Sequence, residues 1–120
     1  MKKKLLVVED DPSIQEVLRL QLSDQGFAVH TVNSGEAALA FLETTAVDLL
    51  LLDLRMPGID GLETAQSVKR RWPALPIILC TVCAEKRFER FIGNEIKAYL
   101  PKPFTFRQLR FTVENALAPR

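Results

Sequence analysis

Residues 47–53 have the sequence VDLLLLD, in which four consecutive leucines are followed by an acid. An unbroken aliphatic run of this kind is typical of a strand that is buried on both faces, as the inner strands of parallel sheets are. We therefore expect a central strand over Val47–Asp53, with the Asp53 carboxylate at its carboxyl end. In an open parallel sheet this is the edge at which ligands bind.

Outside this stretch, short apolar runs alternate with segments of helical periodicity, a pattern that predicts βα units and a parallel sheet. The expected strands are Lys4–Val8, Phe27–Val32, Val47–Asp53, Ile77–Thr81 and Ala98–Leu100. The expected helices run from Pro12 to just before Gly26, from Ser34 to just after Leu42, from about Gly61 to Arg71, from about Glu85 to Ile92, and from Thr105 to just after Leu117. The strand 27–32 mixes apolar and polar residues, so we place it at an edge of the sheet.

Two details of the helices follow from their sequences. In the first helix, the residues expected on the buried face are Ile14, Val17, Leu18 and Leu22. In the last helix, Thr105 and Gln108 have the spacing of a capping box.

The composition is that of an ordinary globular protein. With 120 residues, 48% hydrophobic and 26% charged, the chain is long enough for a single domain with its own core. The net charge of +1 does not favour a nucleic acid or an anionic membrane as partner. The segment Ala118–Arg120 is typical of a domain edge or of the start of a linker. We expect residues 1–120 to form one domain, and any output domain after residue 120 would lie outside this sequence.

The location can also be predicted from the sequence. The apolar stretch Leu5–Val8 is too short for an export signal, and no stretch reaches transmembrane length. Two cysteines in a chain without an export signal fit a reducing compartment. We therefore expect a cytoplasmic protein that does not bind membranes.

Chemically active side chains lie at or just after four of the expected strands. They are Glu9, Asp10 and Asp11 after the first strand, Asp53 at the end of the third, Thr81 at the end of the fourth and Lys102 after the fifth. If these strands are neighbours in a parallel sheet, all of these groups converge at its carboxyl edge. A cluster of carboxylates with an amine and a hydroxyl suits a divalent cation and a phosphoryl group.

The acids are the expected ligands of Mg²⁺, which prefers oxygen ligands. Asp10 and Asp53 would bind directly, and Glu9 directly or through water. Carboxylates held about 4 Å apart repel each other by several kcal/mol at an effective dielectric near 20. A fold tolerates this repulsion where a cation or a pKa shift relieves it. Asp11, directly before Pro12, is expected only to cap the first helix.

Asp53 is the expected nucleophile, because a carboxylate can attack phosphorus and form an acyl phosphate. The bound cation, the Lys102 ammonium and the Thr81 hydroxyl would stabilise the phosphoryl oxygens from three directions. Pro101 and Pro103 flank Lys102 and would hold it in place.

Four segments together resemble the receiver domain of bacterial two-component response regulators. They are VEDD (residues 8–11), DLRMPG with DG (53–58 and 60–61), CT (80–81) and YLPKPF (99–104). The resemblance covers essentially the whole chain, with the segments in the right order. It implies a CheY-like, flavodoxin-like (βα)5 fold: an α/β protein with a doubly wound, five-stranded parallel sheet in the strand order 2-1-3-4-5.

The resemblance also implies the roles of the site residues. Asp53 would accept a phosphoryl group from the phosphohistidine of a sensor histidine kinase or a phosphotransfer protein. Lys102 would pair with the phosphoryl oxygens, and Thr81 would swing toward them together with an inward turn of Tyr99. Mg²⁺, for which Mn²⁺ could substitute, would be held by Glu9, Asp10, Asp53 and the backbone carbonyl of Arg55.

Phosphorylation in this family acts as a switch. It would bias a two-state surface formed by the helix 85–92, the strand 98–100 and the helix after Thr105, a surface that could also form a homodimer. The domain would be a phosphoaccepting switch with at most weak self-phosphorylation and self-dephosphorylation activity. It would not bind nucleic acid itself. The resemblance further implies a cis peptide bond between Lys102 and Pro103. Of the aromatic residues in this region, we expect most to be core and one or two to face a partner: Phe88, Phe91, Phe104, Phe106 and Phe111.

Two features depart from the family pattern. Val82 stands where relatives usually carry a small residue, and its branched side chain should crowd the phosphoryl site. We therefore expect slow phosphorylation, slow hydrolysis or both. Residues 93–97, GNEIK, replace a small, glycine-containing turn, so we expect the helix over 85–92 to be truncated or irregular.

Other classes of protein fit parts of the sequence. A degenerate receiver would act as an interaction module without taking a phosphoryl group, and Val82 is the feature that favours it. Cys80 and Cys83 form a CxxC motif of the kind found in thiol-redox proteins, but Cys80 lies inside an apolar strand and the acids would have no role. A metal-dependent phosphatase with Asp53 as nucleophile would want a general acid two residues later, where Arg55 cannot serve.

Overall fold

The computed structural model describes residues 2–53, 59–81 and 96–118. The elements within these residues are β1 (Lys4–Glu9), α1 (Pro12–Asp24), β2 (Ala28–Val32), α2 (Gly35–Thr44), β3 (Leu49–Asp53), α3 (Ile59–Arg71), β4 (Ile77–Thr81), β5 (Ala98–Pro101) and α4 (Phe106–Leu117). The helix expected over 85–92 and its irregular end lie outside the described residues. The helix α4 is therefore the one expected after Thr105.

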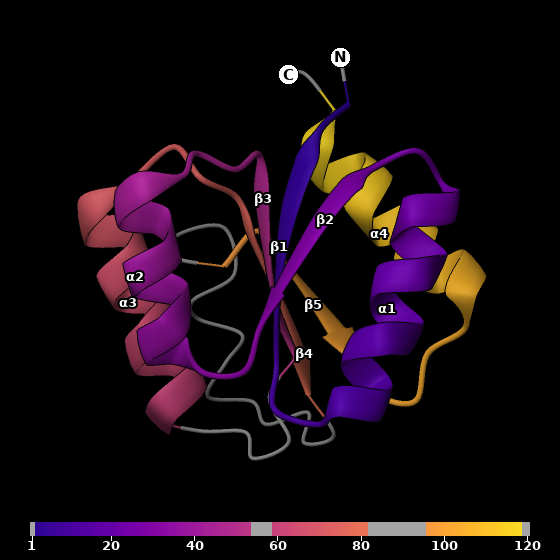
Figure 1. Ribbon diagram of the computed structural model, residues 1–120, viewed down its shortest axis with the longest axis horizontal. Helices are drawn as coiled ribbons and strands as arrows, with labels where there is room; N and C mark the ends of the chain where they lie inside the picture. The colour runs from indigo at the N-terminus through magenta and orange to yellow at the C-terminus, as the bar shows by residue number, and fades with distance from the viewer. Residues whose placement is uncertain (1, 54–58, 82–95, 119–120) are drawn as a thin grey trace.

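The described strands form one parallel sheet in the order β2-β1-β3-β4-β5, the order that the resemblance implied. The predictions of a central β3 and an edge position for β2 are both confirmed. Figure 1 shows α2 and α3 on one face of the sheet and α1 and α4 on the other. The sheet is therefore doubly wound, with one layer of helices on each face.

The helix ends follow from local sequence. Asp11 caps α1 by accepting the N–H groups of the second and third helical residues, and Ser34 caps α2. The predicted capping box of α4 is confirmed: the Gln108 N–H donates to Thr105 Oγ1 at 3.0 Å, and the Thr105 N–H donates to Gln108 Oε1 at 2.8 Å. Gly26 follows α1 with a φ of 97°, a left-handed conformation typical of helix ends.

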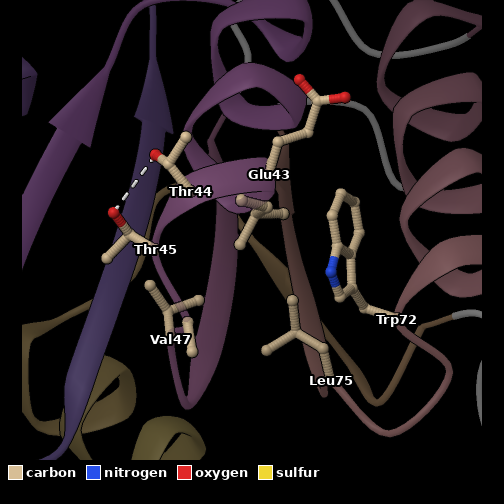
Figure 2. A pocket seen from close by; sticks show the side chains of 8 residues that line it. Glu43, Thr44, Thr45, Val47, Trp72 and Leu75 are labelled. Carbon is tan, nitrogen blue, oxygen red and sulfur yellow. Dashed lines mark hydrogen bonds between the residues drawn. The ribbon is translucent and has the colours of Figure 1, made fainter.

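A hollow of about 270 Å³ opens at the amino ends of β3 and β4, between the C-terminal ends of α2 and α3. Figure 2 shows the Trp72 indole on one side of it, with Glu43 and Val47 on the other. The Arg71 guanidinium carbon lies 4.5 Å from the centroid of the Trp72 ring, and an Arg71 nitrogen lies 2.8 Å from Glu43 Oε2. This hollow lies at the edge of the sheet opposite the predicted acidic site.

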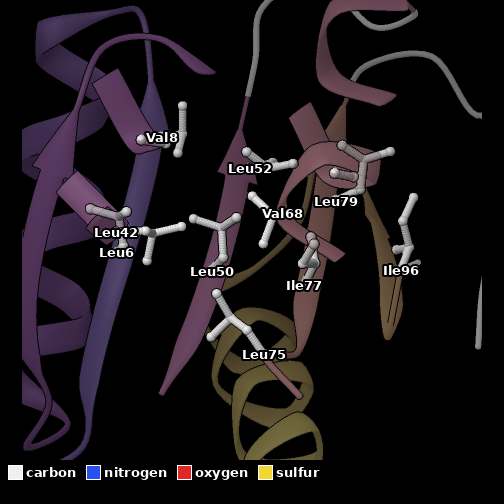
Figure 3. Close-up of a cluster of buried hydrophobic side chains, with 12 residues drawn as sticks. Leu6, Val8, Leu42, Leu50, Leu52, Val68, Leu75, Ile77, Leu79 and Ile96 are labelled. Carbon is white, nitrogen blue, oxygen red and sulfur yellow. The ribbon is translucent and has the colours of Figure 1, made fainter. Parts of the chain in front are cut away.

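Successive side chains of each strand pack on opposite faces of the sheet. Figure 3 shows the cluster on the face of α2 and α3, which includes Leu6, Val8, Leu42, Leu50, Leu52, Val68, Leu75, Ile77, Leu79 and Ile96. The cluster on the face of α1 and α4 includes Leu5, Val7, Leu18, Leu22, Leu49, Leu51, Ile78, Cys80, Leu100, Leu109, Val113 and Ala116. The four leucines of β3 are thus divided between the two faces, and all four are fully buried.

Some expectations about the elements differ from the structure. Element ends are displaced by up to two residues: β3 begins at Leu49 and α3 at Ile59. The prediction that Val17 lies on the buried face of α1 is wrong, because its side chain is 46% exposed. The buried row of α1 instead runs through Leu18 and Leu22, and the position one turn before Leu18 carries a polar residue, Gln15. None of the helices in the described part of the chain is long and apolar enough to span a bilayer.

Candidate functional site

The ladder places two acids side by side at the carboxyl edge of the sheet. Glu9 at the end of β1 is the Cα partner of Asp53 at the end of β3, and Asp53 is in turn the Cα partner of Cys80 on β4. All three side chains are fully buried. Residues two apart on a strand share a face, so these side chains continue the rows of Val7 and Leu51 on the face of α1 and α4.

Lys102 directly follows β5, and its side chain reaches both Glu9 and Asp53. Its Nζ contacts Asp53 Oδ1 and lies 3.6 Å from Glu9 Oε1, and its side chain is 16% exposed. The peptide bond between Lys102 and Pro103 is cis, as the resemblance implied. The other carboxylate oxygen of Asp53, Oδ2, accepts no hydrogen bond from the described residues. Three of the predicted site residues therefore meet in one buried cluster: Glu9, Asp53 and Lys102.

Burial and mutual repulsion perturb the titration of these groups. Burial, and next the neighbouring Asp10, raise the pKa of Glu9 to about 7, although the Asp11 N–H, which donates to Glu9 Oε2 at 2.8 Å, favours the carboxylate. Burial also raises the pKa of Asp53, against the opposing effect of Lys102. Burial alone would lower the pKa of Lys102, but its contact with Asp53 raises it. The acids are therefore costly to ionise together, as expected for a site that holds a cation.

The donor chemistry of the cluster fits Mg²⁺, which prefers carboxylate oxygens. Glu9 Oε1 and Asp53 Oδ2 are buried and accept no hydrogen bond from the described residues, and Asp10 is exposed beside them. Nevertheless, no three His, Cys, Asp or Glu side chains among the described residues are gathered closely enough to hold a metal ion. The Lys102 ammonium contacts the acids instead. The remaining expected ligand, the carbonyl of Arg55, lies outside the described residues.

The loop that carries the acids is tied to its surroundings by Gln15, a residue that sequence reasoning missed. Gln15 Nε2 donates to the backbone carbonyl oxygen of Glu9 at 2.6 Å and to that of Val32 at 3.1 Å. The available signal was a polar residue at helical spacing from Leu18 and Leu22, on the buried row of α1. That spacing indicates burial, but it does not identify the carbonyl groups that the amide reaches.

The predicted switch residues lie on the two last strands of the sheet. Thr81 ends β4, and its Cα partner is Pro101, the residue before Lys102, so the Thr81 backbone lies at the same carboxyl edge. Tyr99 in β5 is half-buried and packs against the cluster on the face of α2 and α3. The structure therefore places Thr81 near the acids along the strand ends and Tyr99 two residues back from that edge.

A groove of about 250 Å³ runs between β5 and α4, and its lining includes Tyr99 and Phe111. Phe111 is 65% exposed and Phe106 is also exposed, whereas Phe104 packs against the core. Two of the five aromatic residues are therefore exposed, and the expectation that one or two face a partner stays a prediction. Two others that were expected to be mostly core, Phe88 and Phe91, lie outside the described residues.

The environment of Cys80 argues against the thiol-redox alternative. The side chain is fully buried, and burial raises the pKa of its thiol well above the ordinary value. A thiol held in this form is a poor nucleophile, since the reactive species is the thiolate. The second cysteine of the motif, Cys83, lies outside the described residues, as does Val82.

A doubly wound sheet with buried acids and a lysine at its carboxyl edge defines the class: a flavodoxin-like α/β protein with a charged site at the strand ends. The family is shown by direct comparison. The model of the response regulator receiver domain matches residues 5–114. The chain belongs to the response regulator receiver domain family.

Individual relatives are similar over nearly the whole chain. The chain is 35% identical over 119 residues to the alkaline phosphatase synthesis transcriptional regulatory protein PhoP of Bacillus subtilis (strain 168), covering 98% of this chain and 49% of PhoP. It thus spans about half the length of that relative. The response regulator TrrA from Thermotoga maritima, solved in complex with Mg²⁺-BeF, is 34% identical with a TM-score of 0.81, covering 96% of this chain and 99% of that one. TrrA in complex with histidine kinase ThkA has a TM-score of 0.83 at 34% identity, covering 97% and 99%.

Proposed function

We propose that the chain is the phosphoacceptor domain of a two-component system and that Asp53 takes the phosphoryl group. The donor is a phosphohistidine of a sensor histidine kinase or a phosphotransfer protein. An Asp53 carboxylate oxygen forms the new P–O bond while the P–N bond to the imidazole breaks, and the leaving imidazole takes up a proton. The observation that carries the proposal is the buried pair of Asp53 and Glu9 in contact with the Lys102 ammonium.

Each neighbour of Asp53 has a distinct role in this transfer. Lys102, which contacts the Asp53 carboxylate, pairs with a phosphoryl oxygen once the group is attached. Thr81 donates its hydroxyl to another phosphoryl oxygen, and Tyr99 follows that movement. Glu9, Asp10, Asp53 and the backbone carbonyl of Arg55 would hold Mg²⁺, or Mn²⁺ in its place. When bound, the cation supplies positive charge beside the phosphoryl oxygens. The Mg²⁺-BeF complex of TrrA supports Mg²⁺ as the cation.

The partners follow from the same role. The complex of ThkA with TrrA supports a sensor histidine kinase as the phosphoryl donor. Residues 1–120 act as one phosphoaccepting switch in the cytoplasm, with at most weak self-phosphorylation and self-dephosphorylation activity and no nucleic-acid binding of their own. We place the output, including a homodimer contact, on the surface formed by the expected helix over 85–92, β5 and α4. The exposed Phe111 and the groove beside it support that location.

The first test is the intact mass of the protein after incubation with phosphoramidate. We expect one phosphoryl adduct in the wild type with Mg²⁺, and none without Mg²⁺ or in Asp53→Asn. Asp48→Asn is the matched control, because Asp48 lies on the same chain segment but at the opposite end of β3, where it accepts the Lys4 N–H at 2.7 Å. This variant should still take up the phosphoryl group.

Failure of the wild type to form an adduct, with Mg²⁺ binding established separately, would contradict the proposal. It would favour the second candidate, a degenerate receiver that binds partners without phosphorylation. The feature behind that alternative is Val82, which lies outside the described residues. An adduct that persists in Asp53→Asn would instead mean that another residue accepts the phosphoryl group.

A further inference from the structure

We propose that Gln15 is a positioning residue that holds the acidic loop in the conformation needed to bind a divalent cation. The inference rests on the proposed function, because it concerns the same site. The inference goes beyond the proposed function because it assigns a role to a residue that touches neither the cation nor the phosphoryl group. Gln15 lies in the first turn of α1, and its side chain is half-buried.

The Gln15 amide forms hydrogen bonds to the ends of two strands. Nε2 donates to the carbonyl oxygen of Glu9, the last residue of β1, at 2.6 Å, and to that of Val32, the last residue of β2, at 3.1 Å. An amide NH₂ has two hydrogens, so both carbonyl groups can be satisfied at once. The side chain thus joins α1 to the carboxyl ends of two neighbouring strands.

The carbonyl group of Glu9 belongs to the peptide unit that joins Glu9 to Asp10. A peptide unit is planar, so holding its oxygen restricts the direction in which the chain leaves toward Asp10. The buried Glu9 and the exposed Asp10 are two of the proposed ligands. One hydrogen bond from Gln15 therefore restricts the positions of both carboxylates.

Two hydrogen bonds made by Asp11 are local. The Asp11 N–H donates to Glu9 Oε2 at 2.8 Å, and Asp11 Oδ1 caps α1. These bonds connect residues two or three positions apart, whereas the Gln15 bonds span 6 and 17 residues. The local bonds shape the turn, and the Gln15 amide places that turn relative to β1 and β2. Residues that orient metal ligands in this way typically change metal affinity by 10- to 100-fold when they are replaced.

The test compares Mg²⁺ affinity with stability in three variants. Gln15→Ala removes the amide. Gln15→Glu keeps its size but replaces the donor with an acceptor and adds a negative charge. Gln21→Ala, on the same helix, removes an equivalent side chain away from the strand ends and is the control. Mg²⁺ dissociation constants are measured by calorimetry, and free energies of unfolding by urea denaturation of the metal-free proteins.

We expect a roughly 10-fold or greater rise in the dissociation constant for Gln15→Ala, and no change for Gln21→Ala. Gln15→Glu separates the effect of positioning from that of charge. An added carboxylate near the site would tighten cation binding if charge were decisive, whereas loss of the two amide hydrogen bonds should weaken it. Weaker binding in both Gln15 variants, with unfolding free energies close to that of Gln21→Ala, supports the inference. Unchanged affinity in Gln15→Ala, or tighter binding in Gln15→Glu, would overturn it.

A second readout does not depend on the cation. In the metal-free protein, we expect the Asp11 amide, which donates to Glu9, to exchange with solvent roughly tenfold faster in Gln15→Ala than in the wild type or in Gln21→Ala. Unchanged Asp11 exchange would contradict the positioning role even if the wild type bound no Mg²⁺. Absence of Mg²⁺ binding by the wild type, with the exchange difference present, would count against the proposed cation site and not against the role of Gln15.

Discussion

Burial in a cluster of charged side chains changes the titration of Glu9. Its pKa is raised from 4.5 to about 7, with burial as the largest cause. In the metal-free protein the folded state therefore keeps a proton, between about pH 4.5 and pH 7, that the unfolded chain has lost. Because the folded state binds more protons in this window, the Glu9 contribution makes the free energy of unfolding fall as pH rises through it.

Glu9→Gln is neutral at every pH and should remove this contribution. In the presence of a chelator, we expect the variant to be more stable than the wild type by about 1–3 kcal/mol at pH 8, and by much less at pH 5. Urea denaturation at the two pH values measures the difference. Glu16→Gln, which removes an exposed carboxylate on α1, should change stability little at either pH. An equal gain for Glu9→Gln at both pH values would show that Glu9 is not the titrating group.

Much of this residue-level chemistry could be predicted from the sequence, and some could not. Acids and a lysine at the ends of apolar runs were enough to predict that Glu9, Asp53 and Lys102 meet. The distances between them depend on the register of the strands, which pairs Glu9 with Asp53. No pattern in either strand specifies this register. The bonds of Gln15 depend on two strands far apart in the sequence, so they become visible only in the folded chain.

Among the elements, α2 and α3 approach each other closely where α2 begins. A Cβ atom added at Gly35 would lie 3.1 Å from Thr64 Cβ and 3.2 Å from Thr64 Cγ2, and closer still to Thr64 Oγ1. Thr64 is buried on α3. The absence of a side chain at Gly35 therefore allows the two helices to pack at this distance, and a larger residue would push them apart or force Thr64 to move.

Gly35→Ala should therefore destabilise the protein, although alanine is ordinarily the better helix former. We expect a loss of about 1–2 kcal/mol in the free energy of unfolding, in the range of overpacked cores. Ala40→Gly, at an exposed position of the same helix, is the control and should show the ordinary preference for alanine. In a Thr64→Ala background, which removes Oγ1 and Cγ2, the loss caused by Gly35→Ala should shrink. A stabilising effect of Gly35→Ala in the wild type would mean that the Thr64 side chain moves away from the new methyl group at little cost in free energy.

The elements themselves were largely predictable, because their signals are local. The leucine run predicted the central β3, the mixed polarity of β2 predicted an edge, and Thr105 with Gln108 predicted the start of α4. The order of all five strands came from the family resemblance, since periodicity alone does not say which strands are neighbours. Val17 was misplaced because residues 14, 17, 18 and 22 suit a helical stripe. In the structure Ile14, Leu18 and Leu22 pack against the core, whereas Val17 is exposed and the half-buried Gln15 reaches the strand ends.

In the molecule as a whole, the proposed site and the hydrophobic core are continuous. Cys80 belongs to the core cluster on the face of α1 and α4, and it is also the ladder partner of Asp53. Its strand, β4, lies inside the sheet between β3 and β5. A reagent can therefore reach the Cys80 sulfur only if this part of the sheet opens, and such an opening would also dismantle the acidic site.

This continuity predicts that Cys80 is protected by the global stability of the fold. In a Cys83→Ser background, where Cys80 is the only thiol, we expect a disulfide reagent such as DTNB to react more than about 10³-fold more slowly with the native protein than with the protein unfolded in guanidinium, since domains of this size are usually stable by 5–15 kcal/mol. When opening is rapid, the reaction rate should rise with added urea in parallel with the unfolded fraction. Rapid reaction in the absence of denaturant would instead mean that β4 opens locally, and that the site can open without unfolding the core.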